Sequence, residues 1–283
     1  MLAEKAHYPV HTMCDALGVS PSGYYAWRGR PLITPQVRAN RALRTRIRAI
    51  HAESRERYGS PRIHHALQAE GAHVGRNRVI RLMRAEQLRG RPQRRFRVTT
   101  THADPAAIPA PNLLNQVFHA PAPNRVWTAD ITALPTGDGW LYLAVLLDLY
   151  SRRIVGWAMR PTLETELVCA AWHMALARRP VAPGLIHHSD RGSQYTSDRY
   201  QALLRAHTVT CSMSRRGNCF DNAPTESFFR TLKVELDEGV WPTRPAALRA
   251  VAAFIERFYN VERLHSSLNY ESPATFEARR VAA

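Results

Sequence analysis

Two carboxylates lie in the stretch 187–236, each in a context that suits chemistry. Asp190 closes a short apolar run. Glu226 begins an amphipathic stretch, with Arg230 and Lys233 following one and two turns later. On an α-helix, residues at this spacing share one face, so the acid and the two bases would line the same surface.

A third acid, Asp130, lies at the centre of the β-rich segment RVWTADITALPT. An uncompensated carboxylate inside a hydrophobic strand costs several kcal/mol, so a compensating charge is expected nearby. Basic side chains could supply it structurally, but three acids from two strand segments and a helix suit hard divalent cations. All-oxygen ligands favour Mg²⁺ or Mn²⁺ over zinc. We therefore predict that Asp130, Asp190 and Glu226 bind two such ions and catalyse an in-line displacement at phosphorus.

Other polar residues near these acids could compete for a role in the site. Asp148 is the strongest rival because it also ends a strand, whereas Asp138 and Asp221 lie in loops and are expected to form turns. His187 and His188 are adjacent on a predicted strand and therefore point to opposite faces, so at most one reaches the acids. We expect core packing or a supporting hydrogen bond, with His188 the candidate for the latter.

The positive charge of the chain is concentrated at its beginning. The formal net charge is +16, and residues 1–100 alone contain 20 Lys or Arg against 6 Asp or Glu. Such asymmetry indicates a module that binds a polyanion, joined to a nearly neutral second part. The alternative is a solvated basic surface without a dedicated partner. The excess of Arg over Lys also fits a GC-rich genome, so the Arg count by itself is weak evidence.

The composition also excludes several classes of protein. No apolar run approaches the ~20 residues of a membrane span, and the N-terminus lacks the apolar core of a secretory signal. We expect a cytoplasmic protein with no membrane partner. The four cysteines form no CxxC pair, which favours reduced thiols and disfavours a zinc finger.

Short helices separated by tight turns are predicted in the basic part. Residues 12–28 read as helix, turn, helix, with Gly18 in the turn and Ser20 and Pro21 starting the second helix. Ser60 and Pro61 repeat this start signal. The following pair of helices resembles a helix-turn-helix DNA reader, for which a small bundle with solvated arginines is the alternative. The expected DNA contacts are Arg76, Arg78 and Arg81 and, in the basic run 89–97, Arg94 and Arg95.

A proline-rich stretch, 99–124, reads as a linker, and strands and helices alternate after it. Three strands, helix, strand, helix, strand and helix predict a mixed α/β sheet covered by helices. The expected domains are a helix-turn-helix-like segment (1–35), a basic helical domain (36–98), the linker (99–122), a catalytic core (123–240) and a helical extension (241–283).

Five motifs together carry a resemblance to a known family: WTADIT, VLLDLYSRRIVGW, HHSDRGSQYTS, NAPTESFFRTLKVEL and YNVERLHSSLNYESPATF. They resemble the second-frame (OrfB) protein of bacterial insertion-sequence transposases of the IS-three family, relatives of retroviral integrases. The resemblance implies an RNase H-like mixed-sheet catalytic core preceded by an all-α helix-turn-helix region. It matches Asp130, Asp190 and Glu226 to the family's acidic triad and Lys233 to its usual basic position.

The resemblance further implies Mg²⁺-dependent 3′-end cleavage and strand transfer of an insertion sequence in the bacterial nucleoid. Synapsis of two DNA ends implies a homo-oligomer, and an upstream-frame OrfA protein is a possible partner or fusion. The zinc-binding arm of retroviral integrases is absent, since His7, His11 and Cys14 have no second cysteine at suitable spacing. Two alternatives stay open: a catalytically silent DNA-binding regulator and an RNase H-like nuclease.

Overall fold

The chain divides into two units, each described here by itself: a helical unit, Met1–Arg91, and a sheet unit, Pro92–Ala283. In the computed structural model, the structure describes residues 7–29, 34–90, 109–181, 183–215, 219–236 and 239–281. Within these ranges no helix has the length and apolar character needed to cross a membrane. The predicted DNA contacts Arg94 and Arg95 lie outside the described residues.

The helical unit contains helices α1 to α5, which span Val10–Ala16, Pro21–Arg28, Pro35–Glu53, Ser60–Ala69 and Arg76–Ala85. The predicted turn and cap are confirmed: Gly18 has a φ of +64°, and the Gly23 N–H donates to Ser20 Oγ at 3.0 Å. The prediction that Ser60 caps a helix is wrong by one residue. Gly59 is the N-cap of α4, and Ser60 is its first helical residue without a capping bond.

Apolar side chains from three helices form the core of the helical unit. Ile47 and Ile50 of α3 pack with Ile63 and Leu67 of α4 and with Val79, Leu82 and Met83 of α5. The stretch 70–75 between α4 and α5 is short, with Gly71 at a positive φ of +81°. This arrangement, a helix pair held on a longer helix by its apolar faces, agrees with the expected helix-turn-helix region.

The sheet unit is organised around a five-stranded sheet in the order β3-β2-β1-β4-β5. Strands β1 to β5 span Val126–Thr136, Gly139–Asp148, Ile154–Arg160, Ile186–Ser189 and Thr210–Met213. The first three pair antiparallel, as the predicted hairpin requires, and β4 and β5 run parallel to β1. This order and mixture of directions confirm the expected mixed α/β class.

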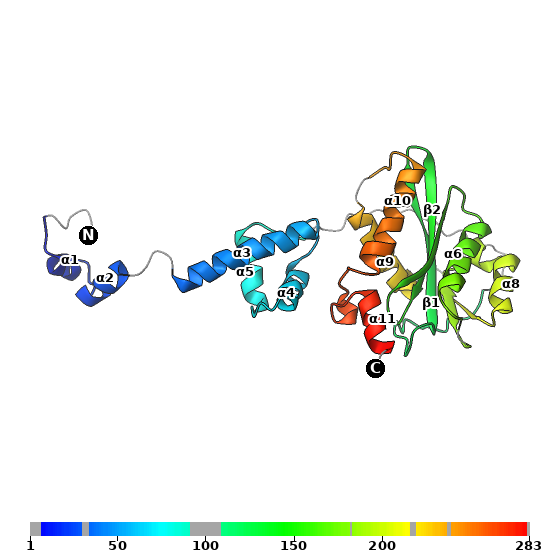
Figure 1. Ribbon diagram of the computed structural model, residues 1–283, viewed down its shortest axis with the longest axis horizontal. Helices are drawn as coiled ribbons and strands as arrows, with labels where there is room; N and C mark the ends of the chain where they lie inside the picture. The colour runs from blue at the N-terminus through cyan, green and yellow to red at the C-terminus, as the bar shows by residue number, and fades with distance from the viewer. Residues whose placement is uncertain are drawn as a thin grey trace. The chain divides into compact units, whose positions relative to one another are not determined.

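Helices cover both faces of the sheet, as Figure 1 shows. One face packs on α6 (Thr165–Arg178), α7 (Ser193–Thr196) and α8 (Asp198–Ala206), and the other packs on α9 (Ala223–Glu235), α10 (Arg244–Ala253) and the π-helical turn η3 (Phe254–Tyr259). Gly156 of β3 permits close packing, because a Cβ there would lie 2.3 Å from the carbonyl oxygen of Ala171 in α6.

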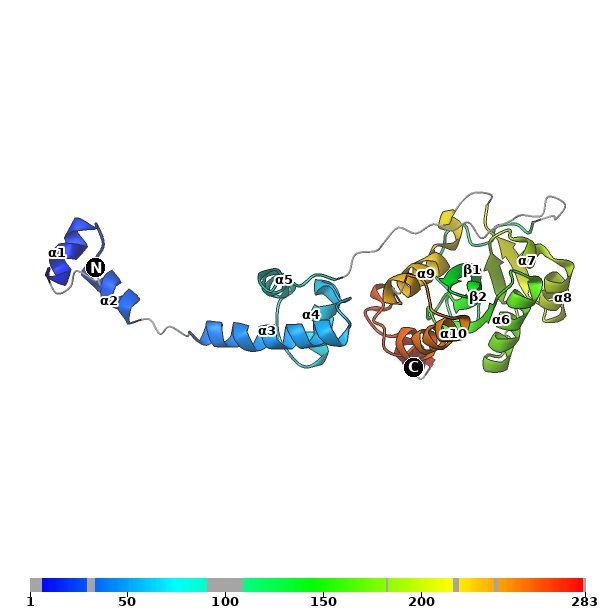
Figure 2. The ribbon, with the colours of Figure 1, turned by 90° about the horizontal axis from the view of Figure 1, so that it is seen from above.

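Side chains of β1 alternate between these two layers. Trp127, Ala129 and Ile131 face the α6 layer, whereas Thr128 contacts α9, and Leu134 packs in the α9 layer. Because successive strand residues point to opposite faces, Asp130 belongs to the α9 face. Viewed from above, α9 lies along one side of β1 and α6 to α8 lie on the other (Figure 2).

The segments that flank this core pack against it. In the C-terminal half of the predicted linker, Leu114 and Ala120 are buried against Leu149. The predicted helical extension is also part of the sheet unit, since Trp241 bridges to Thr136 and α10 covers the sheet. The remaining elements are the 3₁₀ turns η2 (Cys219–Asn222) and η4 (Ser266–Leu268) and helix α11 (Pro273–Val281).

Candidate active site

Helix α9 is fastened to β1 immediately beside Asp130. The hydroxyls of Thr128 on β1 and Thr225 on α9 lie 2.7 Å apart and are buried. The side-chain amide of Asn222, the residue before α9, donates to the Ala129 carbonyl at 3.0 Å. Glu226 follows Thr225 in the first turn of α9, so these two bonds set it beside Asp130.

Asp190 reaches the same place by way of the neighbouring parallel strand. In the pairing of β1 with β4, Thr128 lies opposite His188, so the residue two positions further, Asp190, is level with Asp130. The Gly192 N–H donates to Asp190 Oδ1 at 3.0 Å. A Cβ at Gly192 would approach that oxygen to 3.1 Å, so glycine keeps this turn from crowding the carboxylate.

The three acids and one lysine share an electrostatic field. Burial raises the pKa of Asp130 well above its usual range, and the charges of Asp190 and Glu226 add to the rise, while Lys233 opposes it. Burial also raises the pKa of Glu226, which Arg230 opposes. Burial lowers the pKa of Lys233, with Asp130 acting against the shift. The predicted residues are therefore close enough for their charges to interact.

The donor set suits a divalent cation by its chemistry. All three side chains offer carboxylate oxygens, and a cation among them would relieve the repulsion that raises the pKa of Asp130. Within the described ranges, no three His, Cys, Asp or Glu side chains form a group that could hold a metal ion as they stand.

The two adjacent histidines occupy opposite faces of the sheet, as expected. His187 packs against Trp172 and accepts or donates a hydrogen bond with the Tyr200 hydroxyl at 2.9 Å. His188 lies 2.9 Å from Ser212 Oγ and 3.2 Å from Ser214 Oγ. Burial lowers the pKa of His187 to about 3 and that of His188 to about 4. Both rings are thus neutral and bonded to hydroxyls, and the hydroxyls that His188 contacts belong to Ser212 and Ser214, outside the triad.

The three rival aspartates each have a structural partner. Asp148 is fully buried and accepts the N–H groups of Asn124 at 2.7 Å and Tyr150 at 2.9 Å, so it organises the β2–β3 hairpin. Asp138 accepts the N–H of Arg244 at 2.8 Å, at the start of α10.

Asp221 lies in the 3₁₀ turn η2, as expected, but its carboxylate also binds partners from other segments. Its carboxylate is buried and binds the Arg215 backbone N–H at 2.8 Å and guanidinium at 2.7 Å, together with side-chain amides of Asn112 and Gln116. The Arg215 guanidinium holds the pKa of Asp221 well below its usual range. Asp221 therefore holds the segment that precedes α9 against Arg215, Asn112 and Gln116.

Several residues that support the site carry no sequence signal of their own. Asn222, Thr128 and Thr225 act only through contacts between distant segments. Tyr195, on α7, has a buried hydroxyl with no hydrogen-bond partner in the described part of the chain. Burial raises its pKa, and the charges of Asp130 and Asp190 raise it further, which places this hydroxyl near both acids. In the sequence, the position of Tyr195 five residues after Asp190 is the signal that could have indicated a place near the acids.

The predicted DNA contacts differ in their availability. Arg230 is exposed and Lys233 is half-buried on the Glu226 face of α9. In the helical unit, Arg76 and Arg81 are exposed at the surface of α5. Arg78 is half-buried, and its guanidinium donates twice to Asn40 Oδ1, at 2.7 and 3.0 Å. Its structural bond to α3 therefore competes with a role in DNA contact.

Comparison with known proteins matches both units. Models of the integrase core domain match residues 120–219 and 207–273, and an HTH-like domain model matches residues 38–96. The insertion element IS600 uncharacterized 31 kDa protein of Shigella sonnei is 43% identical, covering 94% of this chain and 98% of its own. Transposase InsF for insertion sequence IS3A of Escherichia coli (strain K12) is 39% identical, and the alignment covers 98% of this chain and 97% of that protein. The crystal structure of the catalytic core domain of BIV integrase is 18% identical, with a TM-score of 0.42, over 56% of this chain and 97% of that chain.

Proposed function

This chain belongs to the IS3 family of insertion-sequence transposases, and from that premise we propose that it performs Mg²⁺-dependent 3′-end cleavage and strand transfer. Its integrase core domain is the polynucleotidyl transferase part, and its HTH-like domain implies interaction with DNA. The proposed substrates are the ends of the insertion sequence and a target DNA.

The observation that carries the proposal is the electrostatic coupling of Asp130 to Asp190 and Glu226. These residues come from β1, from the turn after β4 and from α9, and among the described residues no salt bridge to Asp130 is found. Like charges are costly in a buried setting unless a cation is to be held there. A structural aspartate such as Asp148 is instead surrounded by N–H donors.

Asp130, Asp190 and Glu226 are proposed to hold two Mg²⁺ ions. When bound there, Mg²⁺ or Mn²⁺ activates an oxygen nucleophile and stabilises the leaving oxygen of an in-line displacement. The fastening of α9 to β1 keeps the Glu226 carboxylate on the Asp130 side of the sheet. Lys233 and Arg230, on the Glu226 face of α9, are proposed to bind phosphates beside the reacting one.

The helical unit is proposed to bind the DNA ends. Arg76 and Arg81 are exposed on α5 and would bind phosphate or base edges, and the basic run with Arg94 and Arg95 would lie along the backbone. Because two ends must meet during strand transfer, we propose that the protein works as a homo-oligomer. An upstream-frame OrfA protein is proposed as a further partner.

A set of isosteric variants of the full chain tests the proposal. Asp130→Asn, Asp190→Asn and Glu226→Gln each remove one negative charge at nearly constant size. We expect each to lower metal-dependent cleavage of a duplex carrying the element end by about 10³-fold or more, since metal-assisted charge stabilisation is worth several kcal/mol. The affinity for the duplex should stay within about twofold, because DNA binding relies on basic residues elsewhere.

Asp198→Asn is the matched control, because Asp198 is exposed in the first turn of α8 and undergoes the same chemical change. Substantial cleavage by any of the three triad variants would contradict the assignment. Binding without any cleavage by the wild-type protein would favour the silent regulator, and preferential cleavage of an RNA–DNA hybrid would favour the RNase H-like nuclease.

A further inference from the structure

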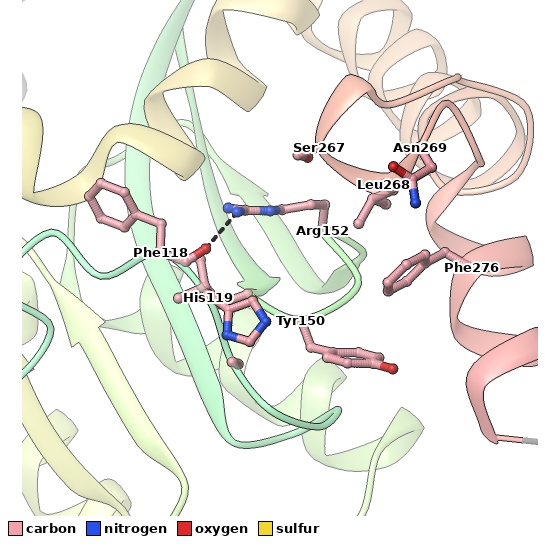
Figure 3. A pocket seen from close by; sticks show the side chains of 10 residues that line it. Phe118, His119, Tyr150, Arg152, Ser267, Leu268, Asn269 and Phe276 are labelled. Carbon is pink, nitrogen blue, oxygen red and sulfur yellow. Dashed lines mark hydrogen bonds between the residues drawn. The ribbon is translucent and has the colours of Figure 1, made fainter. Parts of the chain in front are cut away.

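A small pocket lies at the β2–β3 hairpin of the sheet unit (Figure 3). It encloses about 220 Å³ and is formed by the segments 118–120, 149–152 and 267–269, together with Phe276 of α11. The Arg152 side chain runs across it toward the Phe118 carbonyl, and Tyr150, Asn269 and Phe276 also line the pocket (Figure 3). No residue of the proposed active site lines this pocket.

Arg152 occupies a backbone position that does not favour an arginine. The hairpin closes through hydrogen bonds from the Asp148 N–H to the Arg153 carbonyl, 2.9 Å, and from the Arg152 N–H to the Asp148 carbonyl, 2.8 Å. Arg152 has a φ of +61°, in the left-handed region. A residue with a Cβ costs roughly 1 kcal/mol there, and glycine or asparagine is the usual solution. The turn conformation therefore does not account for an arginine at this position. We look for the reason in the contacts of its side chain.

The guanidinium of Arg152 is half-buried and forms no ion pair with a carboxylate of the described residues. Among those residues it donates to the Phe118 carbonyl at 2.7 Å, and the charge of Asp148 acts on it without a direct contact. The carboxylate of nearby Asp148 is occupied by N–H donors of the hairpin. The neighbouring Arg153 differs, because it pairs with Glu277 at 3.7 Å. Burial lowers the pKa of Arg152, as expected for a cation removed from water.

The pocket's size and lining restrict what could neutralise this charge. Pockets for small molecules usually exceed about 300 Å³, so this one fits a fragment of a larger chain better than a free cofactor. A guanidinium fork is suited to the oxygens of a phosphate group. Asn269 and Ser267 add polar groups at the rim, and the rings of Tyr150 and Phe276, 5.3 Å apart, form an apolar wall.

We propose that this pocket binds a phosphodiester of the DNA backbone, at a second point away from the acidic triad. The inference rests on the proposed function for the identity of the substrate. In the sheet, Asp148 pairs with Trp127, three residues before Asp130 on β1. At ~3.3 Å per residue the hairpin is about 10 Å or more from the acids along the strand. One DNA strand, rising ~3.4 Å per nucleotide, would span this in three or more nucleotides.

The salt dependence of DNA binding by the full chain tests the proposal without requiring metal or catalysis. Arg152→Gln should weaken binding of a labelled duplex that carries the element end. It should also lower the slope of log K against log salt by about 0.9, the effect of one phosphate contact. Arg152→Lys, which keeps the charge, should retain the slope. Arg153→Gln is the matched control, because it removes the same charge one residue away from a side chain already paired with Glu277.

A duplex series with single neutral methylphosphonate linkages locates the contact. At one linkage, neutralisation should weaken binding to the wild-type protein but not to Arg152→Gln, as in a double-mutant cycle. Equal slopes for the wild type and a folded Arg152→Gln protein would overturn the proposal. If Arg152→Gln lowers the Tm, Asn269→Asp is tested instead, because it adds a negative charge to the pocket and leaves the bond to Phe118 intact. This variant should bind the duplex more weakly, and unchanged binding would overturn the proposal. Failure of wild-type cleavage would count against the proposed function alone, because the binding measurement remains valid.

Discussion

The helical unit and the sheet unit each contain an arginine–glutamate ion pair, and the two pairs differ in burial. In the helical unit, Arg46 pairs with Glu70 at side chains that are 43% and 36% exposed. In the sheet unit, Arg179 pairs with Glu277 at side chains that are only 12% and 11% exposed. The sheet unit also buries His187 and brings acids of like charge near one another. The two ion pairs therefore differ in burial: solvent screens Arg46–Glu70 in the helical unit, whereas Arg179–Glu277 in the sheet unit is largely removed from water.

The largest effect is expected for the stability of the sheet unit at acidic pH. Burial, followed by the charge of His188, lowers the pKa of His187 from 6.5 to about 3. The unfolded chain therefore binds a proton below pH 6.5 that the folded protein excludes, and the free energy of unfolding should fall as the pH is lowered from 6.5 toward 3. At about 1.4 kcal/mol per pKa unit, the loss is up to about 5 kcal/mol.

Urea unfolding as a function of pH measures this loss. His187→Phe should make the dependence between pH 6.5 and 3 less steep, and His188, whose pKa burial lowers to about 4, should supply the part that remains. The variant also loses absolute stability, because the Tyr200 hydroxyl is left without its partner. His173→Phe is a comparison in the same unit, on the partly exposed side of α6. An equally steep dependence in the wild type and His187→Phe would show that His187 is not the group responsible.

The second test removes one acid from an ion pair in each unit. Glu277→Gln leaves the mostly buried Arg179 without its carboxylate, so we expect it to cost about 3 kcal/mol of unfolding free energy. Glu70→Gln makes the same change to a solvent-screened pair and should cost far less. Thermal and urea unfolding of both variants at neutral pH give the comparison. Similar losses in the two variants would remove the proposed difference between the units.

The smallest effect is expected for DNA binding by the helical unit. Arg76→Gln with Arg81→Gln should lower affinity for the element end by about tenfold and reduce the salt slope by up to about 0.9 for each phosphate contact. Arg48→Gln is the control, since Arg48 already pairs with Glu86 at 2.6 Å. Titrations at several salt concentrations distinguish these cases. A slope that falls as much in the control would mean that pairing does not limit which arginines reach DNA.

Local patterns in the sequence predicted much of the architecture. Apolar periodicity predicted the strands and helices, and the turn at Gly18 and the cap at Ser20 are confirmed. The mixed sheet was predicted from the order of strands and helices, and the opposite orientations of His187 and His188 follow from the two-residue repeat of a strand. The start of α4 was missed by one residue, because Ser60 and Gly59 are both suitable caps and the sequence does not distinguish them.

Residues that act through distant partners escaped prediction. Asp221 was expected in a turn because its neighbours are Gly, Asn and Pro, yet its partners include Asn112, 109 residues away. Arg78 was expected to contact DNA, and its bond to Asn40 spans 38 residues. In each case the side chain type allowed both roles, and only the packing of separate segments decides between them.

The sequence by itself determined the chemical types present: three acids in strand and helix contexts, an arginine-rich first hundred residues and motifs typical of a transposase family. These are properties of short segments. Only the tertiary structure decided that the parallel pairing of β1 and β4 sets Asp190 level with Asp130, and that Thr225 bonds Thr128 across 97 residues. It also decided that Arg153 pairs with Glu277, whereas Arg152 forms no ion pair with any carboxylate of the described residues. Register and counter-ion choice depend on which distant segments meet, and the fold alone fixes that.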